Sequence, residues 1–185
     1  MAAVKYFEGL LAVSTDGWYV HYANSSVIRL ANIYARHFVD CNRGVNGIEG
    51  SLSTAAGFSL VTEDKVFCVI GDLSFFYDQN ALWNQNLRSN LRILLLNNGG
   101  GGIFDTLPGL EQSPARDRLV AACHQTSAEG ICRQNNIGYR QAANMEDMQS
   151  GIDWLTAGDS SRPLLLEVIT DADTDAQVFR DYLNS

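Results

Sequence analysis

The stretch that decides the fold is GDLSFFYDQNALWNQNLRSNLRILLLNN, which runs from Gly71 to Asn98. It follows VFCVI at Val66 to Ile70 and contains RILLL at Arg92 to Leu96. Short, continuous apolar runs of this kind are typical of strands buried on both faces of a parallel sheet. The chain between the two runs is long enough for the helical crossover that parallel strands require. The stretch therefore predicts two parallel strands joined by a helix.

The rest of the chain continues this alternation of strands and helices. Strands are expected at Trp18 to Tyr22 and at Leu164 to Thr170, and an amphipathic helix is expected from Val27 to Phe38. Further helical patterns cover residues 5–13, 117–122, 127–134, 145–155 and 176–183. The length of 185 residues suits one domain with a sizeable core. We expect an α/β fold over residues 1–185, with a parallel sheet covered by helices on both faces.

Composition excludes several classes of partner. The 13 basic and 21 acidic residues give a net charge of −8, which disfavours nucleic acid because its binding proteins usually present a basic face. No apolar stretch approaches the roughly 18 residues of a membrane span, and the N-terminus lacks the pattern of a signal peptide. The four cysteines form no CxxC pair, so we expect a soluble, cytoplasmic protein. Cys123, His124 and Cys132 lack the paired spacing of a zinc site.

Polar residues follow the two central strands. Asp72 and Asn98 would project from the carboxyl edge of the sheet, where open α/β sheets bind ligands. With backbone carbonyls of Gly99 to Gly102, they form a set of hard oxygen ligands suited to Mg²⁺ held jointly with a phosphate. Each residue also has a purely structural interpretation. Asp72 could cap the following helix through amides near Ser74 and Phe75, and the asparagines could simply form a turn.

Two arginines are further candidates. Arg29 and Arg43 near the same edge could clamp substrate carboxylates through bidentate contacts, although either could be a surface cation. Other phosphate and nucleophile motifs are absent from the sequence: GxxxxGK[ST], GxGxxG between a strand and a helix, and GxSxG. A P-loop nucleotidase, a Rossmann dehydrogenase and a serine hydrolase are therefore disfavoured.

The Gly-Asp and Asn-Asn pairs at the ends of the stretch resemble the thiamine diphosphate motif. In that motif the aspartate, the second asparagine and a backbone carbonyl two residues later bind Mg²⁺. The resemblance assigns these roles to Asp72, Asn98 and Gly100, with Mn²⁺ as an alternative ion. The third motif residue is usually glycine, but here it is Leu73.

Four motifs in order give a narrower resemblance. They are NSSVIRL (residues 24–30), NRGVNGIEGSLSTAAG (42–57), GDLS with YDxNAL (71–82) and NNGGGGIF (97–104). Together they resemble the carboxy-terminal domain of 2-succinyl-5-enolpyruvyl-6-hydroxy-3-cyclohexene-1-carboxylate synthase of menaquinone biosynthesis. The resemblance implies a transferase that decarboxylates 2-oxoglutarate and adds the succinyl-semialdehyde unit to isochorismate.

The same resemblance assigns roles to individual residues. Ser25, Arg29 and Arg43 would contact carboxylates of the substrate or intermediate, and Phe104 would border the active-site cavity. Ile48 would support the bent cofactor. The backbone around the diphosphate would come from Gly71, Leu73 and Ser74.

The resemblance also implies missing parts. Enzymes of this family carry an amino-terminal domain that binds the cofactor's pyrimidine and supplies the catalytic glutamate, followed by a middle domain. We expect this chain to be the carboxy-terminal fragment of such a three-domain homo-oligomer, with sites completed by another subunit, and to be inactive alone. The alternatives are another thiamine diphosphate-dependent 2-oxoacid decarboxylase or acetohydroxyacid synthase, and a non-catalytic binding or assembly domain of the same fold.

Overall fold

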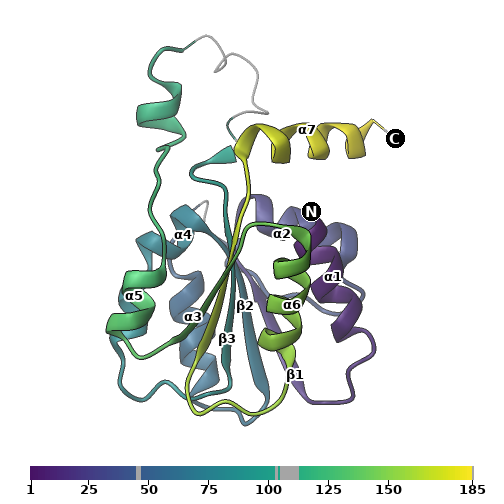
Figure 1. Cartoon of the computed structure of the whole chain (residues 1–185), viewed down its shortest axis with the longest axis vertical. Helices are drawn as coiled ribbons and strands as arrows, with labels where there is room; N and C mark the ends of the chain where they lie inside the picture. Colours follow the sequence, from purple (N-terminus) through teal and green to yellow (C-terminus); the bar gives the residue numbers. More distant parts are fainter. Residues whose placement is uncertain (45–46, 103, 105–112, 185) are drawn as a thin grey trace.

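The computed structural model describes residues 1–44, 47–102, 104 and 113–184 (Figure 1). Within these residues the strands form one five-stranded sheet in the order β1-β2-β3-β5-β4. Every neighbouring pair is parallel. The strands are β1 (Trp18–Tyr22), β2 (Lys65–Gly71), β3 (Leu91–Asn97), β4 (Gly138–Ala142) and β5 (Leu164–Ile169). This arrangement confirms the predicted parallel α/β fold.

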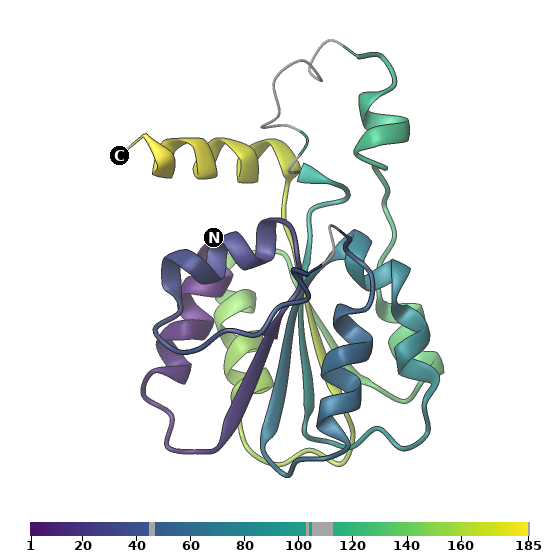
Figure 2. The same ribbon diagram turned by 180° about the vertical axis from the view of Figure 1, so that it is seen from behind.

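Helices cover both faces of the sheet (Figures 1 and 2). They are α1 (Ala2–Leu11), α2 (Ser26–Tyr34), α3 (Ser51–Ser59), α4 (Asp72–Tyr77), α5 (Glu129–Gln134), α6 (Met145–Thr156) and α7 (Ala172–Leu183). A 3₁₀ helix, η1 (Gln79–Trp83), follows α4, and a π-helical turn, η3 (Arg116–Val120), precedes α5. None of the described helices has the length and apolar composition needed to cross a bilayer.

The central strand β3 illustrates how the two core layers are built. Successive side chains of a strand point to opposite faces, so Ile93 and Leu95 pack in the layer of α3, α4 and α5, while Leu94 packs in the layer of α1, α2 and α6. All three side chains are fully buried. An apolar run without alternation is therefore what a strand covered on both faces requires.

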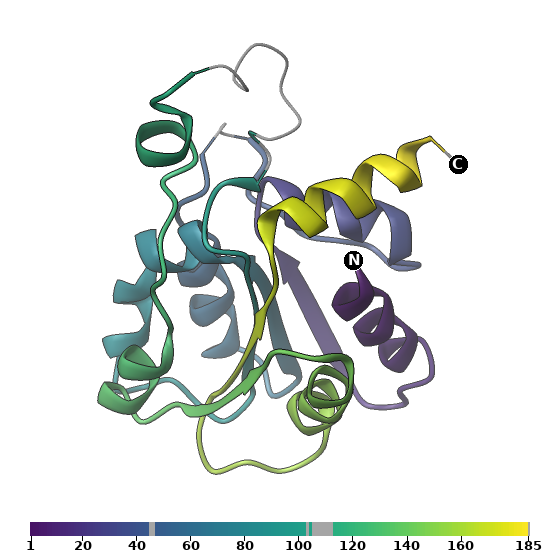
Figure 3. The same ribbon diagram turned by 45° about the horizontal axis from the view of Figure 1, so that its top comes forward.

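The strand register brings the ends of β2 and β3 to the same level. Gly71 pairs with Leu96, so the residue after β2 lies beside the last residue of β3. Asn97 in turn pairs with Ile169 of β5. The loops that follow these strands therefore leave the sheet together at its carboxyl edge, the edge from which α7 also begins (Figure 3).

Two local predictions were wrong, and one strand was missed. The helix expected to reach Phe38 ends at Tyr34, because Ala35 takes an extended conformation, and Phe38 is 85% exposed. Met145 shares its helical spacing with Met148, Ile152 and Leu155, and that spacing predicts a core position for it; instead it is 57% exposed at the start of α6. The edge strand β4 was not predicted, since its sequence GYRQA lacks an apolar run.

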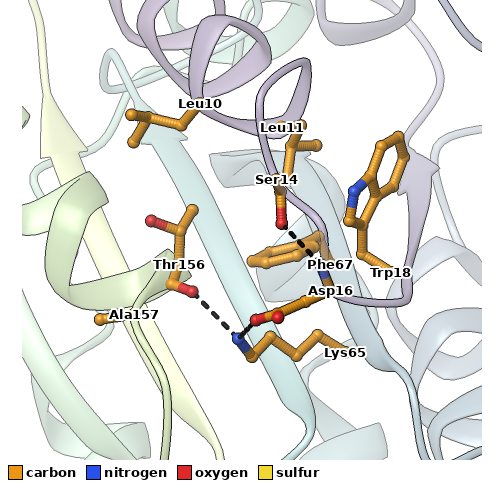
Figure 4. Close-up of a pocket in the computed structure, with 9 residues that line it drawn as sticks. All are labelled: Leu10, Leu11, Ser14, Asp16, Trp18, Lys65, Phe67, Thr156 and Ala157. Carbon is orange, nitrogen blue, oxygen red and sulfur yellow. Dashed lines mark hydrogen bonds and ion pairs between the residues drawn. The ribbon is translucent and has the colours of Figure 1, made fainter.

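The amino edge of the sheet holds a small cavity of about 180 Å³ (Figure 4). The Lys65 ammonium group at its wall pairs with Asp16 at 2.9 Å and donates a hydrogen bond to the Thr156 carbonyl at 3.3 Å. These contacts tie the loops before β1 and after α6 to the start of β2. The polar groups there are engaged in structural contacts, whereas the predicted site residues lie at the opposite edge.

Candidate functional site

Hydrogen bonds join loops from distant parts of the chain at the carboxyl edge. The Asn24 side chain, after β1, donates to the Gly47 carbonyl at 2.8 Å. The Ser74 hydroxyl, after β2, donates to the Ile48 carbonyl in the loop before α3. These contacts bring Ile48 next to the first turn of α4, as the predicted cofactor site requires.

Asp72 is the first residue of α4 and is only 4% exposed. Its Oδ1 accepts a hydrogen bond from the Leu73 amide at 2.7 Å, and its Oδ2 accepts one from the Gly100 amide at 2.8 Å. Within α4 it therefore accepts from the Leu73 amide, whereas no bond from the Ser74 or Phe75 amides considered from the sequence is described. Instead it links the end of β2 to the glycine loop after β3.

His124 lies beside this carboxylate, which the sequence did not predict. Its Nε2 is 3.2 Å from Asp72 Oδ2, and its ring lies edge-on to Phe76 at a centroid distance of 5.3 Å. The Nε2 atom is buried and has no hydrogen-bond partner among the described residues, although it lies close to the carboxylate. Burial raises the pKa of Asp72, while the Leu73 amide and His124 oppose this shift.

No local pattern in the sequence marks His124. The chain around it has no regular periodicity, and only the tertiary fold brings it to Asp72. Cys132, another of the three residues in the disfavoured zinc set, is buried in the core layer of α5. Among the described residues, no cluster of three or more histidine, cysteine or acidic side chains is arranged to hold a metal.

The glycine loop lies against the segment Ala121–His124. The Gly101 amide donates to the Ala121 carbonyl at 2.7 Å, and the His124 amide donates to the Gly99 carbonyl at 2.8 Å. Gly99 has φ of 79°, and a Cβ there would lie 2.9 Å from the His124 oxygen. A Cβ on Gly100 would lie 3.0 Å from the Ala121 oxygen. The close approach of two backbones therefore requires glycine at position 99 and favours it at position 100.

Asn98 and Phe104 belong to the same turn. A Cβ on Gly102 would lie 2.7 Å from Asn98 Nδ2, and one on Gly101 would lie 2.8 Å from the Phe104 ring. Both side chains are half-buried. The predicted residues Asp72, Asn98 and Gly100 are thus held in one region by the Asp72 contact with the loop.

This region is chemically suited to a magnesium diphosphate. Carboxylate, amide and carbonyl oxygens are hard donors that Mg²⁺ prefers. The glycines remove side chains where a phosphate group would approach the backbone, and backbone amides stabilise such anions. Among the described residues, the Asp72 carboxylate contacts backbone amides and the His124 ring, and no lysine or arginine contact to it is described. The residues therefore fit the group that the sequence motif implies.

Arg29 and Arg43 line one open cavity of about 550 Å³. Its described walls are Ile28, Arg29, Asn32, Val39, Cys41 and Arg43. Both arginine side chains are exposed, and Arg43 is close enough to Cys41 to oppose the rise in the pKa of that thiol caused by burial. Two guanidinium groups over partly apolar walls can hold a carboxylate with a short carbon chain.

The other predicted residues surround these two regions. Ser25 stands at the start of α2 with φ of 75°, a rare conformation for a residue with a side chain that is often found at functional sites. Gly71, Leu73 and Ser74 form the end of β2 and the first turn of α4. Val45, Asn46 and Ile103, which belong to the quoted motifs, lie outside the described residues.

Asp78 in the YDxNAL motif has a structural role. It is buried at the end of α4, where its carboxylate accepts hydrogen bonds from the Ser53 amide at 2.7 Å and the Ser53 hydroxyl at 2.5 Å. Ser53 lies in the first turn of α3, whose amides lack partners within the helix. Asp78 therefore caps α3 from a distance and holds it against α4.

The fold and the site define a class of protein. Residues 23–168 match the family described as thiamine pyrophosphate enzyme, C-terminal TPP binding domain, and the chain belongs to this family. The matched region begins at the end of β1 and ends within β5, so it contains both candidate regions.

Particular relatives share one name. The chain is 48% identical over 167 residues to 2-succinyl-5-enolpyruvyl-6-hydroxy-3-cyclohexene-1-carboxylate synthase of Bacteroides thetaiotaomicron, a match that covers 88% of this chain and 30% of the relative. The proteins of the same name from Phocaeicola vulgatus and Christiangramia forsetii are 45% and 41% identical, over 88% and 89% of this chain and 30% and 29% of the relatives. These similarities confirm the resemblance based on the four motifs. The chain spans about a third of the length of these relatives.

A Gly99→Ala substitution tests the backbone contact in the glycine loop. We expect it to lower the free energy of unfolding by about 1–2 kcal/mol, because a left-handed conformation is costly for alanine and the new Cβ would contact the His124 oxygen. Urea denaturation measures the change. Gly57→Ala is the matched control, since a Cβ there meets nothing within 4 Å on α3 and should stabilise by about 0.5–1 kcal/mol. Equal stabilities of the two variants would contradict the described loop geometry.

Proposed function

We propose that the chain is the diphosphate- and magnesium-binding domain of a thiamine diphosphate-dependent transferase. In the complete enzyme, 2-oxoglutarate is decarboxylated and the succinyl-semialdehyde unit is added to isochorismate in menaquinone biosynthesis. The observation that carries this proposal is the Asp72 contact with the glycine loop, in a chain whose family binds the cofactor. The names of the relatives support the choice of reaction.

In this proposal Asp72, Asn98 and the Gly100 carbonyl hold Mg²⁺, or Mn²⁺ in its place. The backbone of Gly71, Leu73 and Ser74 binds the diphosphate, and Ile48 supports the bent cofactor; its carbonyl is already fixed by the Ser74 hydroxyl. When bound, thiamine diphosphate supplies the electron sink for decarboxylation. The protein's contribution here is to orient the cofactor and neutralise its charge.

The substrates are held by a separate group of residues. Arg29 and Arg43 bind carboxylates, which both 2-oxoglutarate and isochorismate carry in pairs. Ser25 contacts the substrate or intermediate from the start of α2, and Phe104 borders the cavity. The cavity shared by the arginines supports this division between a metal region and a carboxylate region.

The complete site needs further domains. The chain spans 30% of the length of the Bacteroides thetaiotaomicron relative, and we propose that an amino-terminal domain from another subunit binds the pyrimidine and provides the catalytic glutamate. The enzyme is accordingly a cytoplasmic homo-oligomer, and this chain alone does not turn over. Formation of the isochorismate adduct by the isolated chain would contradict that part of the proposal.

Calorimetric titration with thiamine diphosphate, with and without Mg²⁺, tests the metal region. We expect binding that requires Mg²⁺ and that weakens at least about tenfold in Asp72→Asn, because a neutral amide is a poorer ligand. Asp78→Asn is the matched control, since it removes another buried carboxylate close to the same helix and should affect stability without changing the metal requirement. Binding that ignores Mg²⁺, or an unchanged Asp72→Asn variant, would contradict the proposal.

Saturation-transfer NMR with 2-oxoglutarate tests the carboxylate region independently. Arg29→Ala and Arg43→Ala should each abolish most of the transfer signal, and the lysine variants should retain part of it, because lysine keeps the charge but loses the bidentate geometry. Arg133→Ala, at an exposed position on α5, should leave the signal unchanged. Equal signals in all variants would remove Arg29 and Arg43 from the substrate site.

A further inference from the structure

Glu167 in β5 is a fully buried carboxylate. It accepts hydrogen bonds from Asn97 Nδ2 at 2.8 Å, the Ser127 hydroxyl at 2.9 Å and the Tyr139 hydroxyl at 2.5 Å. The Ala128 amide also donates to it, at 3.2 and 3.3 Å to its two oxygens. A buried charge is costly unless such donors replace water, so this cluster is a built polar site inside the core.

The donors come from three separate elements. Asn97 ends β3, Ser127 and Ala128 precede α5, and Tyr139 lies in β4. Burial and the hydrogen bond to Glu167 both raise the pKa of Tyr139, so its hydroxyl stays protonated and remains a donor. Glu167 therefore connects the last residue of the central strand to the elements on the other side of β5.

The Asn97 side chain links Glu167 to the glycine loop through hydrogen bonds to both. Its Nδ2 donates to Glu167 and, at 2.9 Å, to the Thr126 carbonyl, so both amide hydrogens have acceptors. The amide plane is thereby fixed with Oδ1 toward the Gly99 amide, from which it accepts a hydrogen bond at 3.1 Å. Gly99 is followed by Gly100, whose amide meets Asp72.

We propose that Glu167 is a positioning residue for the magnesium region and acts through Asn97. This inference rests on the proposed function. Neither side chain contacts the metal; together they set the turn that presents Asn98 and the Gly100 carbonyl. An apolar residue at position 167 would suit the core, but it would leave Asn97 Nδ2 and the Ala128 amide without their buried acceptor.

A double-mutant cycle tests the role. Glu167→Leu removes the acceptor of the Asn97 amide and puts a side chain that suits the core in its place, and Asn97→Ala removes the side chain through which Glu167 acts. The double variant N97A/E167L then shows whether the two residues act on the loop as one unit or independently. Glu8→Leu is the matched control, because Glu8 is a buried carboxylate in α1 that accepts bonds from Tyr22 and His37, far from this loop.

Two quantities are measured on the chain: amide hydrogen exchange at Gly99 and Gly100 by NMR, and the Mg²⁺ concentration for half-maximal thiamine diphosphate binding. Each single variant should accelerate exchange at both glycines at least about tenfold and raise the Mg²⁺ requirement by about tenfold or more, as for residues that orient metal ligands. The double variant should stay within about threefold of Asn97→Ala in both quantities, because Glu167 has no other route to the loop once the Asn97 side chain is gone. Glu8→Leu should lower the melting temperature and change neither quantity.

A purely structural role gives a different result. If Glu167→Leu lowers the melting temperature as Glu8→Leu does, without changing glycine exchange or the Mg²⁺ requirement, the inference is overturned. Additive effects of the two substitutions in the double variant would also overturn it, because Glu167 would then act on the loop by a route other than Asn97. Should Glu167→Leu fail to fold, Glu167→Asp keeps the charge, shortens the reach to Asn97 and is judged by the same measurements.

Failure of the proposed function would be recognised separately. If the wild-type chain binds thiamine diphosphate without Mg²⁺, the metal assignment fails and Glu167 cannot position a magnesium site. The exchange rates at Gly99 and Gly100 would still report whether Glu167 and Asn97 set the loop. The two results therefore separate an error in the metal site from an error in the coupling.

Discussion

The hydrogen bond from the Gly100 amide to the Asp72 carboxylate is the contact on which the candidate site depends. The register between β2 and β3 aligns Gly71 with Leu96, so the two loops start side by side. The single bond of 2.8 Å then fixes their relative position. Because Asn98 and the Gly100 carbonyl belong to the same loop, all three proposed magnesium ligands are ordered by this contact.

Buried carboxylates organise the carboxyl edge as a whole. Asp72 fixes the glycine loop, Asp78 caps α3, and Glu167 fixes Asn97. Asp78 and Glu167 have their described oxygens occupied by hydroxyl, amide and backbone donors, which makes their burial tolerable. Asp72 differs because its described hydrogen bonds come from only two backbone amides, and no lysine or arginine contact to it is described. A bound cation would therefore supply the missing positive charge, in a protein whose net charge is −8.

The sequence predicted the three central strands and the edge strand β1, but it missed the other edge strand, β4. The apolar runs of β2, β3 and β5 reflect burial on both faces, so they stand out without any knowledge of the fold. The edge strand β4 pairs only with β5, and its GYRQA sequence carries no comparable signal. The helix predicted to reach Phe38 ends earlier, because the helical spacing of apolar residues does not mark where the backbone turns at Ala35.

The same difference separates the residues of the candidate site. Asp72 and Asn98 were predictable because each follows a recognisable strand, whereas His124 and Glu167 were not, because their importance comes from contacts across 52 and 70 positions of sequence with Asp72 and Asn97.

Paramagnetic relaxation by Mn²⁺ is the most direct measurement of the central claim. In the presence of thiamine diphosphate, Mn²⁺ should broaden the amide signals of Leu73, Ser74 and Gly99 to Gly101 before all others, because these backbone groups surround the proposed ion. Signals around the cavity at the amino edge, such as that of Lys65, should remain sharp. If Mn²⁺ first broadened amide signals of residues remote from Asp72 and the glycine loop, the proposed site would be contradicted.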